Sequence, residues 1–257
     1  MSSYLTALEH FNEHRNTLKM TTGFANLDSL IDSIEERRAL KTYLLVLASG
    51  GMRAVEGLAI RIKDIDFSLS PTKVHIRKEY AKTRVARDVY ISDEAAQYLR
   101  EWIDWKHRNK QTPAKPEEEL VFGVGQSTNP RELYKAIQHE FSKYLELAGF
   151  TERKDDSNRH KVTIHSLRKF VDSTITDQTG KDYAEWYLGH SRSPYYTKKE
   201  PERREIYATK FMKYLTFLDC SLLEAGRVTV LKRDYRKRPR RFKLSKSRWP
   251  RWRTRRN

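Results

Sequence analysis

Two adjacent tyrosines, Tyr195 and Tyr196, follow His190 in the stretch GHSRSPYYTKK, which covers residues 189–199. A tyrosine hydroxyl can act as a covalent nucleophile and so divide one difficult displacement into two easier steps. The ordinary pKa of a tyrosine is about 10, so it needs cationic surroundings to react as a phenolate. The cations that could provide these surroundings have to come from other parts of the chain.

Four such cations stand beside apolar positions. Arg53 follows Gly50-Gly51-Met52 at a predicted helix start, and Lys82 lies in the charged middle of a predicted hairpin. His165 and Arg168 are three residues apart in TIHSLRKF, so they share one face if a helix begins there. Each has an ordinary structural alternative when taken singly: an arginine paired with a carboxylate, a core or capping histidine, a turn lysine.

As a set, these residues suit a phosphodiester. Guanidinium groups match nonbridging phosphate oxygens in a bidentate way, and histidine donors add hydrogen bonds as charge develops in the transition state. A lysine can protonate the departing sugar oxygen. No Asp or Glu lies at a metal-ligand spacing from His165 and His190, so we expect no metal and no cofactor.

The elements that would position these residues are mainly helical. Residues 74–92 alternate on both sides of a charged middle, which indicates a hairpin and one small antiparallel sheet. Capping signals at Ser92 and at Asn129-Pro130 predict two further helices. The predicted fold class is α+β, with helical segments at about 39–48, 93–103, 130–148, 165–178, 181–188 and 201–213.

Taken in order, the motifs resemble the tyrosine recombinases of the phage-integrase family. The resemblance covers about residues 40–219 and rests on five elements: SGGMRAVEGLAIRIKDIDF (49–67), YAKTRVARDVYIS (80–92), TIHSLRKF (163–170), YLGH (187–190) and a following tyrosine. It implies the tyrosine-recombinase catalytic fold. The stretch KKEPERREIYATKFMKYLTFLD (198–219) is similar to the end of archaeal and archaeal-virus integrases, which implies an origin in an archaeal mobile element.

The resemblance also implies a role for each matching residue. Arg53 and Arg168 would bind the scissile phosphate. His165 would donate to this phosphate and handle the proton of the nucleophile, and His190 would add a hydrogen bond. Lys82 would protonate the 5′-hydroxyl leaving group. Strand exchange through a 3′-phosphotyrosyl bond then needs neither ATP nor metal. From its spacing to Arg53, we expect Glu56 to orient that arginine.

The spacing of the nucleophile departs from the family pattern. The family places its tyrosine about nine residues after the final histidine, whereas Tyr195, Tyr196 and Tyr207 follow His190 by five, six and seventeen residues. We favour Tyr196 because it is nearer the family spacing and precedes the Thr-Lys-Lys run into the last helix. Tyr195 is the alternative, and Tyr207 comes third.

The positive charge is concentrated at the end of the chain. Residues 227–257 hold fifteen Lys or Arg against one acid, Asp234, of a net charge of +17 for the whole chain. Such a segment cannot bury enough apolar surface to fold alone, and its natural partner is a polyanion. The expected DNA contacts are Arg236, Lys237, Arg238, Arg240, Arg241, Arg248, Trp249, Arg251, Trp252 and Arg253. RNA or an anionic membrane surface are the alternatives for the tail alone.

We expect three parts: an N-terminal helical segment (1–24), a catalytic domain (25–221) and a flexible basic tail (222–257). Family members usually carry a separate helical DNA-binding domain before the first arginine motif, but only about 50 residues precede Arg53. The tail would substitute for that domain, or the chain is a fragment of a longer integrase. The expected partners are double-stranded DNA and further copies of the chain, as a tetramer on DNA, with no membrane.

The chain has a single cysteine, Cys220, which excludes an internal disulfide, and its N-terminus lacks a secretion signal. We therefore expect a cytoplasmic, nucleoid-associated protein. The predicted function is that of a site-specific DNA recombinase. The alternatives are a non-catalytic DNA-binding remnant, such as a split-integrase fragment, and a topoisomerase of type IB, which shares the chemistry.

Overall fold

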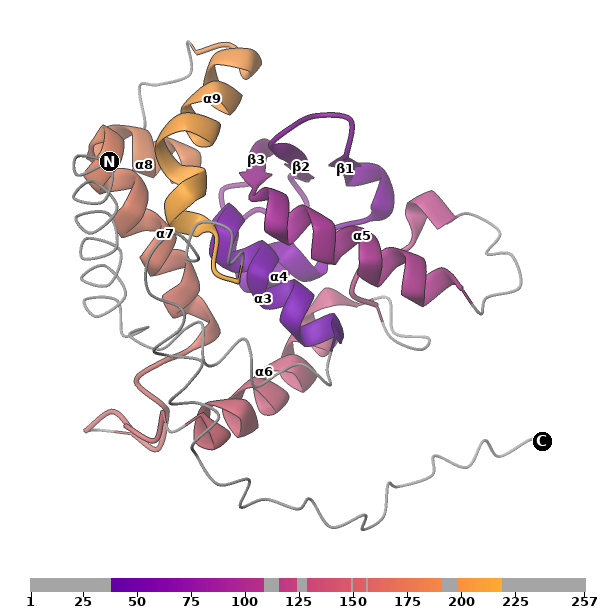
Figure 1. Ribbon diagram of the computed structural model, residues 1–257. Helices are drawn as coiled ribbons and strands as arrows, with labels where there is room; N and C mark the ends of the chain where they lie inside the picture. Colours follow the sequence, from indigo (N-terminus) through magenta and orange to yellow (C-terminus); the bar gives the residue numbers. More distant parts are fainter. Residues whose placement is uncertain are drawn as a thin grey trace, which may run out of the picture. The chain divides into compact units, whose positions relative to one another are not determined.

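The computed structural model describes residues 38–108, 116–123, 129–148, 150–155, 157–190 and 198–218. These residues form a mostly helical structure with one three-stranded antiparallel sheet (Figure 1), so the predicted α+β class is confirmed. The chain divides into two units after Leu218, and all described residues belong to the first. The predicted segments 1–24 and 222–257 lie outside the described residues.

The elements follow one another in a simple order. They are α3 (Arg38–Gly50), α4 (Ala54–Leu58), η1 (Ile62–Asp64), β1 (Ile65–Asp66), β2 (Thr72–Ile76), β3 (Arg87–Ile91), α5 (Asp93–His107), η2 (Pro116–Glu118), α6 (Pro130–Leu147), α7 (Ile164–Thr179), α8 (Lys181–Tyr187), α9 (Glu200–Ile206), the π-helical turn η3 (Tyr207–Phe211) and the 3-10 turn η4 (Met212–Leu215).

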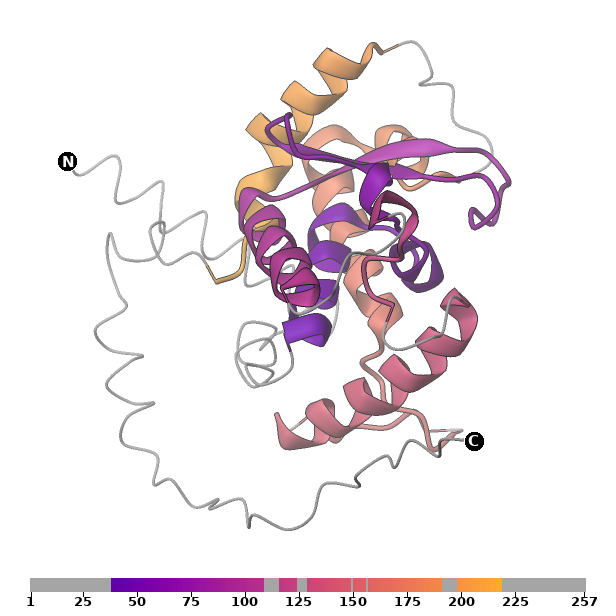
Figure 2. The ribbon, with the colours of Figure 1, turned by 90° about the vertical axis from the view of Figure 1, so that its right-hand side faces the viewer.

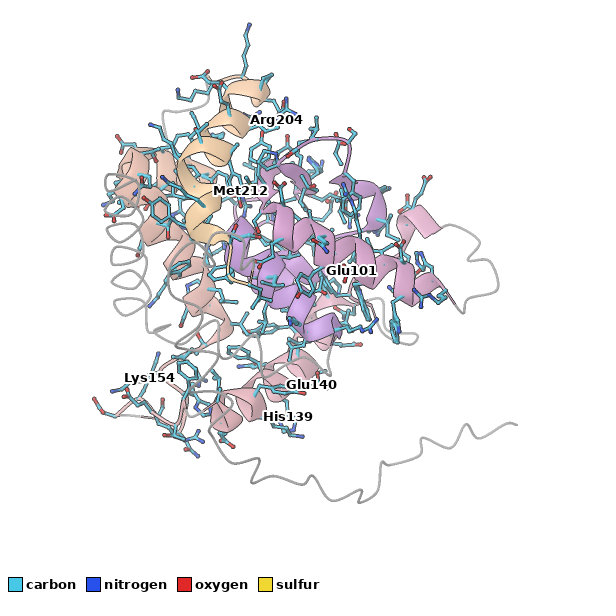
Figure 3. All side chains as sticks on the ribbon, in the orientation of Figure 1. Glu101, His139, Glu140, Lys154, Arg204 and Met212 are labelled. Carbon is cyan, nitrogen blue, oxygen red and sulfur yellow. The ribbon has the colours of Figure 1, made fainter. Side chains whose placement is uncertain are left out.

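Helix α3 is the centre of the core. Every residue from Leu40 to Gly50 is buried. A helix that is buried on all sides has to be surrounded, and α3 contacts α4, α5, α7 and β3. Side chains fill the space between these elements (Figure 3). The end of α3 therefore has a fixed position, and it is followed directly by the segment that carries Arg53.

The sheet has the order β1-β2-β3, and the predicted hairpin is confirmed. Val74 pairs with Val89, and Ile76 pairs with Arg87. Because side chains alternate along a strand, Arg87 shares its face with Val89 and Ile91, which are both buried. The hairpin of β2 and β3 extends to one side of α3 (Figure 2).

Both predicted capping signals are confirmed. The Ser92 hydroxyl accepts a hydrogen bond from the amide of Ala95 at the start of α5, at 3.3 Å. The Asn129 side chain accepts one from the amide of Arg131 at the start of α6, at 3.0 Å. These side chains satisfy amide groups that have no partner inside the helix, which fixes where each helix begins.

The last predicted helix, about 201–213, is not one regular α-helix. It is α-helical only to Ile206 and continues as the π-helical turn η3 and the 3-10 turn η4. The side chains at both ends of η3, Tyr207 and Phe211, are fully buried. The widened turn places both of them in the core.

Tyr187, the last residue of α8, binds this helix to β3. Its hydroxyl donates to the carbonyl of Tyr90 at 3.2 Å and accepts from the amide of Tyr90 at 3.1 Å. The ring of Tyr187 also stacks with that of Tyr207 at a centroid distance of 6.3 Å. These contacts fix the position of the Leu188-Gly189-His190 turn, which follows α8.

Candidate active site

Arg53 precedes helix α4 and is paired with Glu56 one turn later. Arg53 Nη1 donates to Glu56 Oε1 at 2.9 Å, and the Arg53 backbone amide donates to Glu56 Oε2 at 2.8 Å. The Glu56 side chain is fully buried, whereas that of Arg53 is 22% exposed. The carboxylate thus holds the backbone and the side chain of Arg53 together, which is the arrangement expected from their spacing.

Arg87 is a second partner of the same carboxylate. Its Nη2 donates to Glu56 Oε2 at 2.7 Å, and its Nη1 donates to Glu56 Oε1 at 3.2 Å. Burial alone would raise the pKa of Glu56, but the hydrogen bonds and charges of Arg87 and then Arg53 lower it below its usual value. Glu56 is therefore a carboxylate that stays ionised in the core because two arginines surround it.

Arg168 lies one turn into α7 and connects two distant motifs. Its Nη1 donates to the carbonyl of Gly51 at 2.7 Å, and its Nη2 donates to the carbonyl of Leu188 at 2.7 Å. Burial and the nearby charges of Arg53 and Arg87 lower the pKa of Arg168 to about 10. The guanidinium remains charged at neutral pH, but like charges surround it, which favours an anion beside it.

His190 stands between Arg168 and a carboxylate of α8. Its Nδ1 lies 2.6 Å from Glu185 Oε2, and its Nε2 lies 3.1 Å from Arg168 Nη2. The guanidinium can only donate, so in the neutral ring Nε2 accepts and Nδ1 carries the hydrogen that Glu185 accepts. Glu185 therefore fixes the orientation of the ring, with the Nε2 edge directed at the arginine.

His165, at the start of α7, is exposed on the same side of the helix as Arg168. Partial burial lowers the pKa of His165, and the charges of Arg168, Lys169 and Arg53 lower it further. The imidazole is consequently neutral at physiological pH, and a neutral ring can accept a proton.

The structure brings together Arg53, Glu56, Arg168 and His190, with His165 close enough to experience the same charges. Lys82 is exposed in the loop between β2 and β3. Among the described residues, the carboxylate of this cluster, Glu56, binds Arg53 and Arg87, and Lys82 makes no ion pair with it.

The candidate nucleophiles have different positions. Tyr195 and Tyr196 lie outside the described residues, between His190 and Lys198. Tyr207 is fully buried, and its hydroxyl donates to the carbonyl of Ser49 at 3.0 Å. Its geometry is that of a core tyrosine, which leaves Tyr196 and Tyr195 as the candidates. Within the described ranges, no group of three His, Cys, Asp or Glu side chains is placed to hold a metal ion.

The model of the phage integrase family matches residues 22–200. The chain belongs to the phage integrase family. The match spans all four sequence motifs up to His190, and Arg168 of the third motif donates to backbone carbonyls of the first motif, at Gly51, and of the fourth, at Leu188. This phage integrase family chain has no matching relative among curated proteins. No helix among its described residues is long and apolar enough to cross a membrane.

Several solved structures resemble this phage integrase family chain at low identity. The XerA recombinase is 20% identical with a TM-score of 0.49, over 70% of this chain and 61% of XerA. The XerH recombinase in its pre-cleavage complex with difH is 18% identical with a TM-score of 0.49, over 71% of this chain and 48% of XerH. A lambda integrase tetramer bound to a Holliday junction is 14% identical with a TM-score of 0.44, over 67% of this chain and 47% of the lambda integrase chain. The chain thus spans about half to three fifths of their length, and its family membership rests on the family model instead.

Sequence reasoning missed two members of the site, Arg87 and Glu185. Arg87 was detectable, because the alternation in β3 places it on the same face as Val89 and Ile91, where a cation needs a buried carboxylate. Glu185 has a weaker signal. Its contact with His190 depends on the chain turning at the end of α8, which spacing alone does not predict.

Proposed function

We propose that the protein is a site-specific DNA recombinase that cleaves and rejoins DNA through a covalent 3′-phosphotyrosine. One observation carries the proposal: Arg53, Arg168 and His190 come from three separate motifs and lie in one cluster. Arg53 binds the buried carboxylate of Glu56, and Arg168 binds the carbonyls of Gly51 and Leu188 and contacts His190. Membership of the phage integrase family supports it.

The charge of this cluster suits a phosphate. Arg53 and Arg87 bind one carboxylate, Glu56, and the charges of these two arginines lower the pKa of Arg168 despite the opposing influence of Glu56 and Asp172, so positive charge predominates at Arg168. A phosphodiester between Arg53 and Arg168 would relieve this repulsion and accept bidentate hydrogen bonds. The donors are held in place before the substrate arrives, and such preorganised donors stabilise the charge that develops in a transition state.

The proposed chemistry gives one role to each of the remaining residues. The Tyr196 hydroxyl attacks phosphorus while His165 accepts its proton, and a bond forms between the tyrosine oxygen and phosphorus. The bond from phosphorus to the 5′ oxygen breaks, its electron pair stays on that oxygen, and Lys82 supplies the proton. Rejoining is the reverse: a 5′-hydroxyl attacks the phosphotyrosine and the phenol leaves. The bond energy is kept in the intermediate, so no ATP is used.

The proposed partners are double-stranded DNA and other copies of the chain. The XerH structure is described as bound to its difH substrate, and the lambda integrase structure as a tetramer on a Holliday junction. By analogy we propose a tetramer on DNA, located at the nucleoid, with the basic residues of 222–257 as additional DNA contacts. The resemblance at 198–219 supports an origin in an archaeal mobile element.

A suicide-substrate assay tests the function. DNA of the source genome is fragmented, nicked and incubated with the protein, so that cleavage near a nick releases a short strand and traps the covalent complex. We expect an adduct that survives boiling in SDS, whose peptide mass maps to Tyr196 and whose DNA defines the site.

Two other outcomes would contradict the proposed function, and a third would change only the assigned nucleophile. A well-folded protein that binds these fragments and forms no adduct is a DNA-binding remnant. Relaxation of supercoiled plasmid without preference for a site indicates a topoisomerase. An adduct at Tyr195 keeps the function and replaces the nucleophile.

A further inference from the structure

Arg87 is a cation on the core face of a strand. It shares this face of β3 with Val89 and Ile91, and its side chain is only 11% exposed. A charge in such a place is unfavourable unless it is paired and hydrogen-bonded. Its partner is Glu56, which lies 31 residues earlier in the chain and is fully buried.

The hydrogen bonds of Glu56 are divided unequally between its two arginines. Arg87 binds the carboxylate with both terminal nitrogens, at 3.2 and 2.7 Å. The Arg53 side chain uses one terminal nitrogen, at 2.9 Å. Arg87 therefore binds both oxygens of the carboxylate. Within the described residues, most N–H donors of the Arg53 guanidinium do not bind Glu56. Those donors are the ones that an anion would use.

Arg87 also lies against the turn that carries His190. A Cβ atom added to Gly189 would be 2.8 Å from Cδ and 2.9 Å from Nε of Arg87. Gly189 has φ +73°, a conformation that favours glycine. The position of Arg87 thus depends on the absence of a side chain at Gly189, and the position of the turn depends on Arg87.

We propose that Arg87 is a positioning residue for DNA cleavage: it holds Glu56, and through Glu56 the guanidinium of Arg53, in register with the turn before His190. The inference rests on the proposed function, because the anion that Arg53 and His190 would share is the scissile phosphate. Arg87 itself does not touch that phosphate.

Replacing Arg87 with lysine tests this role. Lysine keeps the charge, but its single nitrogen cannot bind both carboxylate oxygens in the planar geometry of a guanidinium. We expect Arg87→Lys to slow adduct formation at saturating suicide DNA at least tenfold, while the Kd for DNA changes less than threefold. Such a split between rate and affinity is not expected from a general loss of folding.

Arg77 provides a matched control at the other end of the same loop. Its Nε lies 3.1 Å from Asp64 Oδ2, and its Nη2 donates to the carbonyl of Ala59 at 2.8 Å. Arg77, like Arg87, therefore binds a buried carboxylate, but that carboxylate is Asp64 and not Glu56, which binds Arg53. We expect Arg77→Lys to change the rate of adduct formation less than threefold. Equal losses of rate in the two variants, or an Arg87→Lys rate within twofold of the parent, would overturn the proposal.

A second measurement separates this proposal from the proposed function. We expect inorganic phosphate to raise the melting temperature of the parent and of Arg77→Lys, but to have at most half this effect on Arg87→Lys. A parent that binds phosphate but forms no adduct contradicts the recombinase function, and the comparison of melting temperatures still decides the role of Arg87. A parent that neither responds to phosphate nor forms an adduct contradicts both.

Discussion

Tyr207 donates its hydroxyl hydrogen to the backbone carbonyl of Ser49, at 3.0 Å and across 158 residues of sequence. Both groups are buried, and burial raises the pKa of Tyr207 well above its usual value. A phenol of this kind is a poor nucleophile, because it has no access to substrate and its ionised form is disfavoured. The bond instead fixes the end of α3 to the turn η3.

We therefore expect Tyr207→Phe to affect stability and not chemistry. The loss of the hydroxyl leaves the buried Ser49 carbonyl without its donor, which costs about 1–2 kcal/mol in the free energy of unfolding. Chemical denaturation measures this loss, and the suicide-substrate assay should still give an adduct. Tyr196→Phe provides the contrast, because we expect it to give no adduct. A missing adduct in a folded Tyr207→Phe protein would reverse the order of our candidates.

Arg168→Lys should damage both the fold and the chemistry. A lysine keeps the charge but cannot reach the carbonyls of Gly51 and Leu188 together, so at least one of them loses its charged donor. We expect a loss of roughly 2–3 kcal/mol in the free energy of unfolding and no detectable adduct. Lys169→Arg is the control, because that side chain is the exposed neighbour. A stable, fully active Arg168→Lys protein would contradict the bridging role of the guanidinium.

The titration of His165 should affect the pH dependence of both stability and adduct formation. Its pKa lies below the usual value of 6.5 in the folded protein, so the unfolded chain binds this proton more tightly. His165 therefore reduces stability as the pH falls from about 6.5 through its folded pKa, and it has no such effect above this range. Adduct formation should decline over the same interval, because the protonated ring cannot accept the tyrosine proton.

His165→Asn should remove both effects, and His139→Asn should remove neither, since His139 lies exposed on α6 (Figure 3). Thermal unfolding and adduct formation, each measured from pH 5 to 8, check this prediction. If His165→Asn and the parent keep the same pH profile, another group accepts the proton.

Local signals were sufficient to predict most of the elements. Ser92 and Asn129 have side chains that cap the helix directly after them, and Val74 and Val89 show the alternation of a hairpin. These signals act between neighbours in the chain. The contact between Glu56 and Arg87 spans 31 residues and depends on how β3 and α4 each pack against α3, so no local pattern predicts it.

The basic tail should increase the affinity for DNA, and it should make this affinity more dependent on salt concentration. Deleting residues 227–257 removes fifteen Lys or Arg. Each phosphate that the shortened protein no longer neutralises should reduce the slope of log K against log salt by about one unit. We expect weaker binding and a flatter slope for the truncated protein, measured by fluorescence anisotropy with duplex DNA between 50 and 200 mM salt as a typical range. A slope equal to that of the full chain would exclude the tail as a DNA contact.

Strand β3 holds both ends of the segment that contains Tyr195 and Tyr196. Arg87, its first residue, lies against Gly189, and the hydroxyl of Tyr90 donates to Glu200 at the start of α9, at 3.2 Å to Oε1. The flanks are thus held by contacts that do not involve the residues between them. The number of residues between these two flanks can therefore differ without moving either flank. A nucleophile six residues after His190, where the family pattern has about nine, is therefore compatible with unchanged positions of His190 and α9. Inserting a few residues between them should leave both in place.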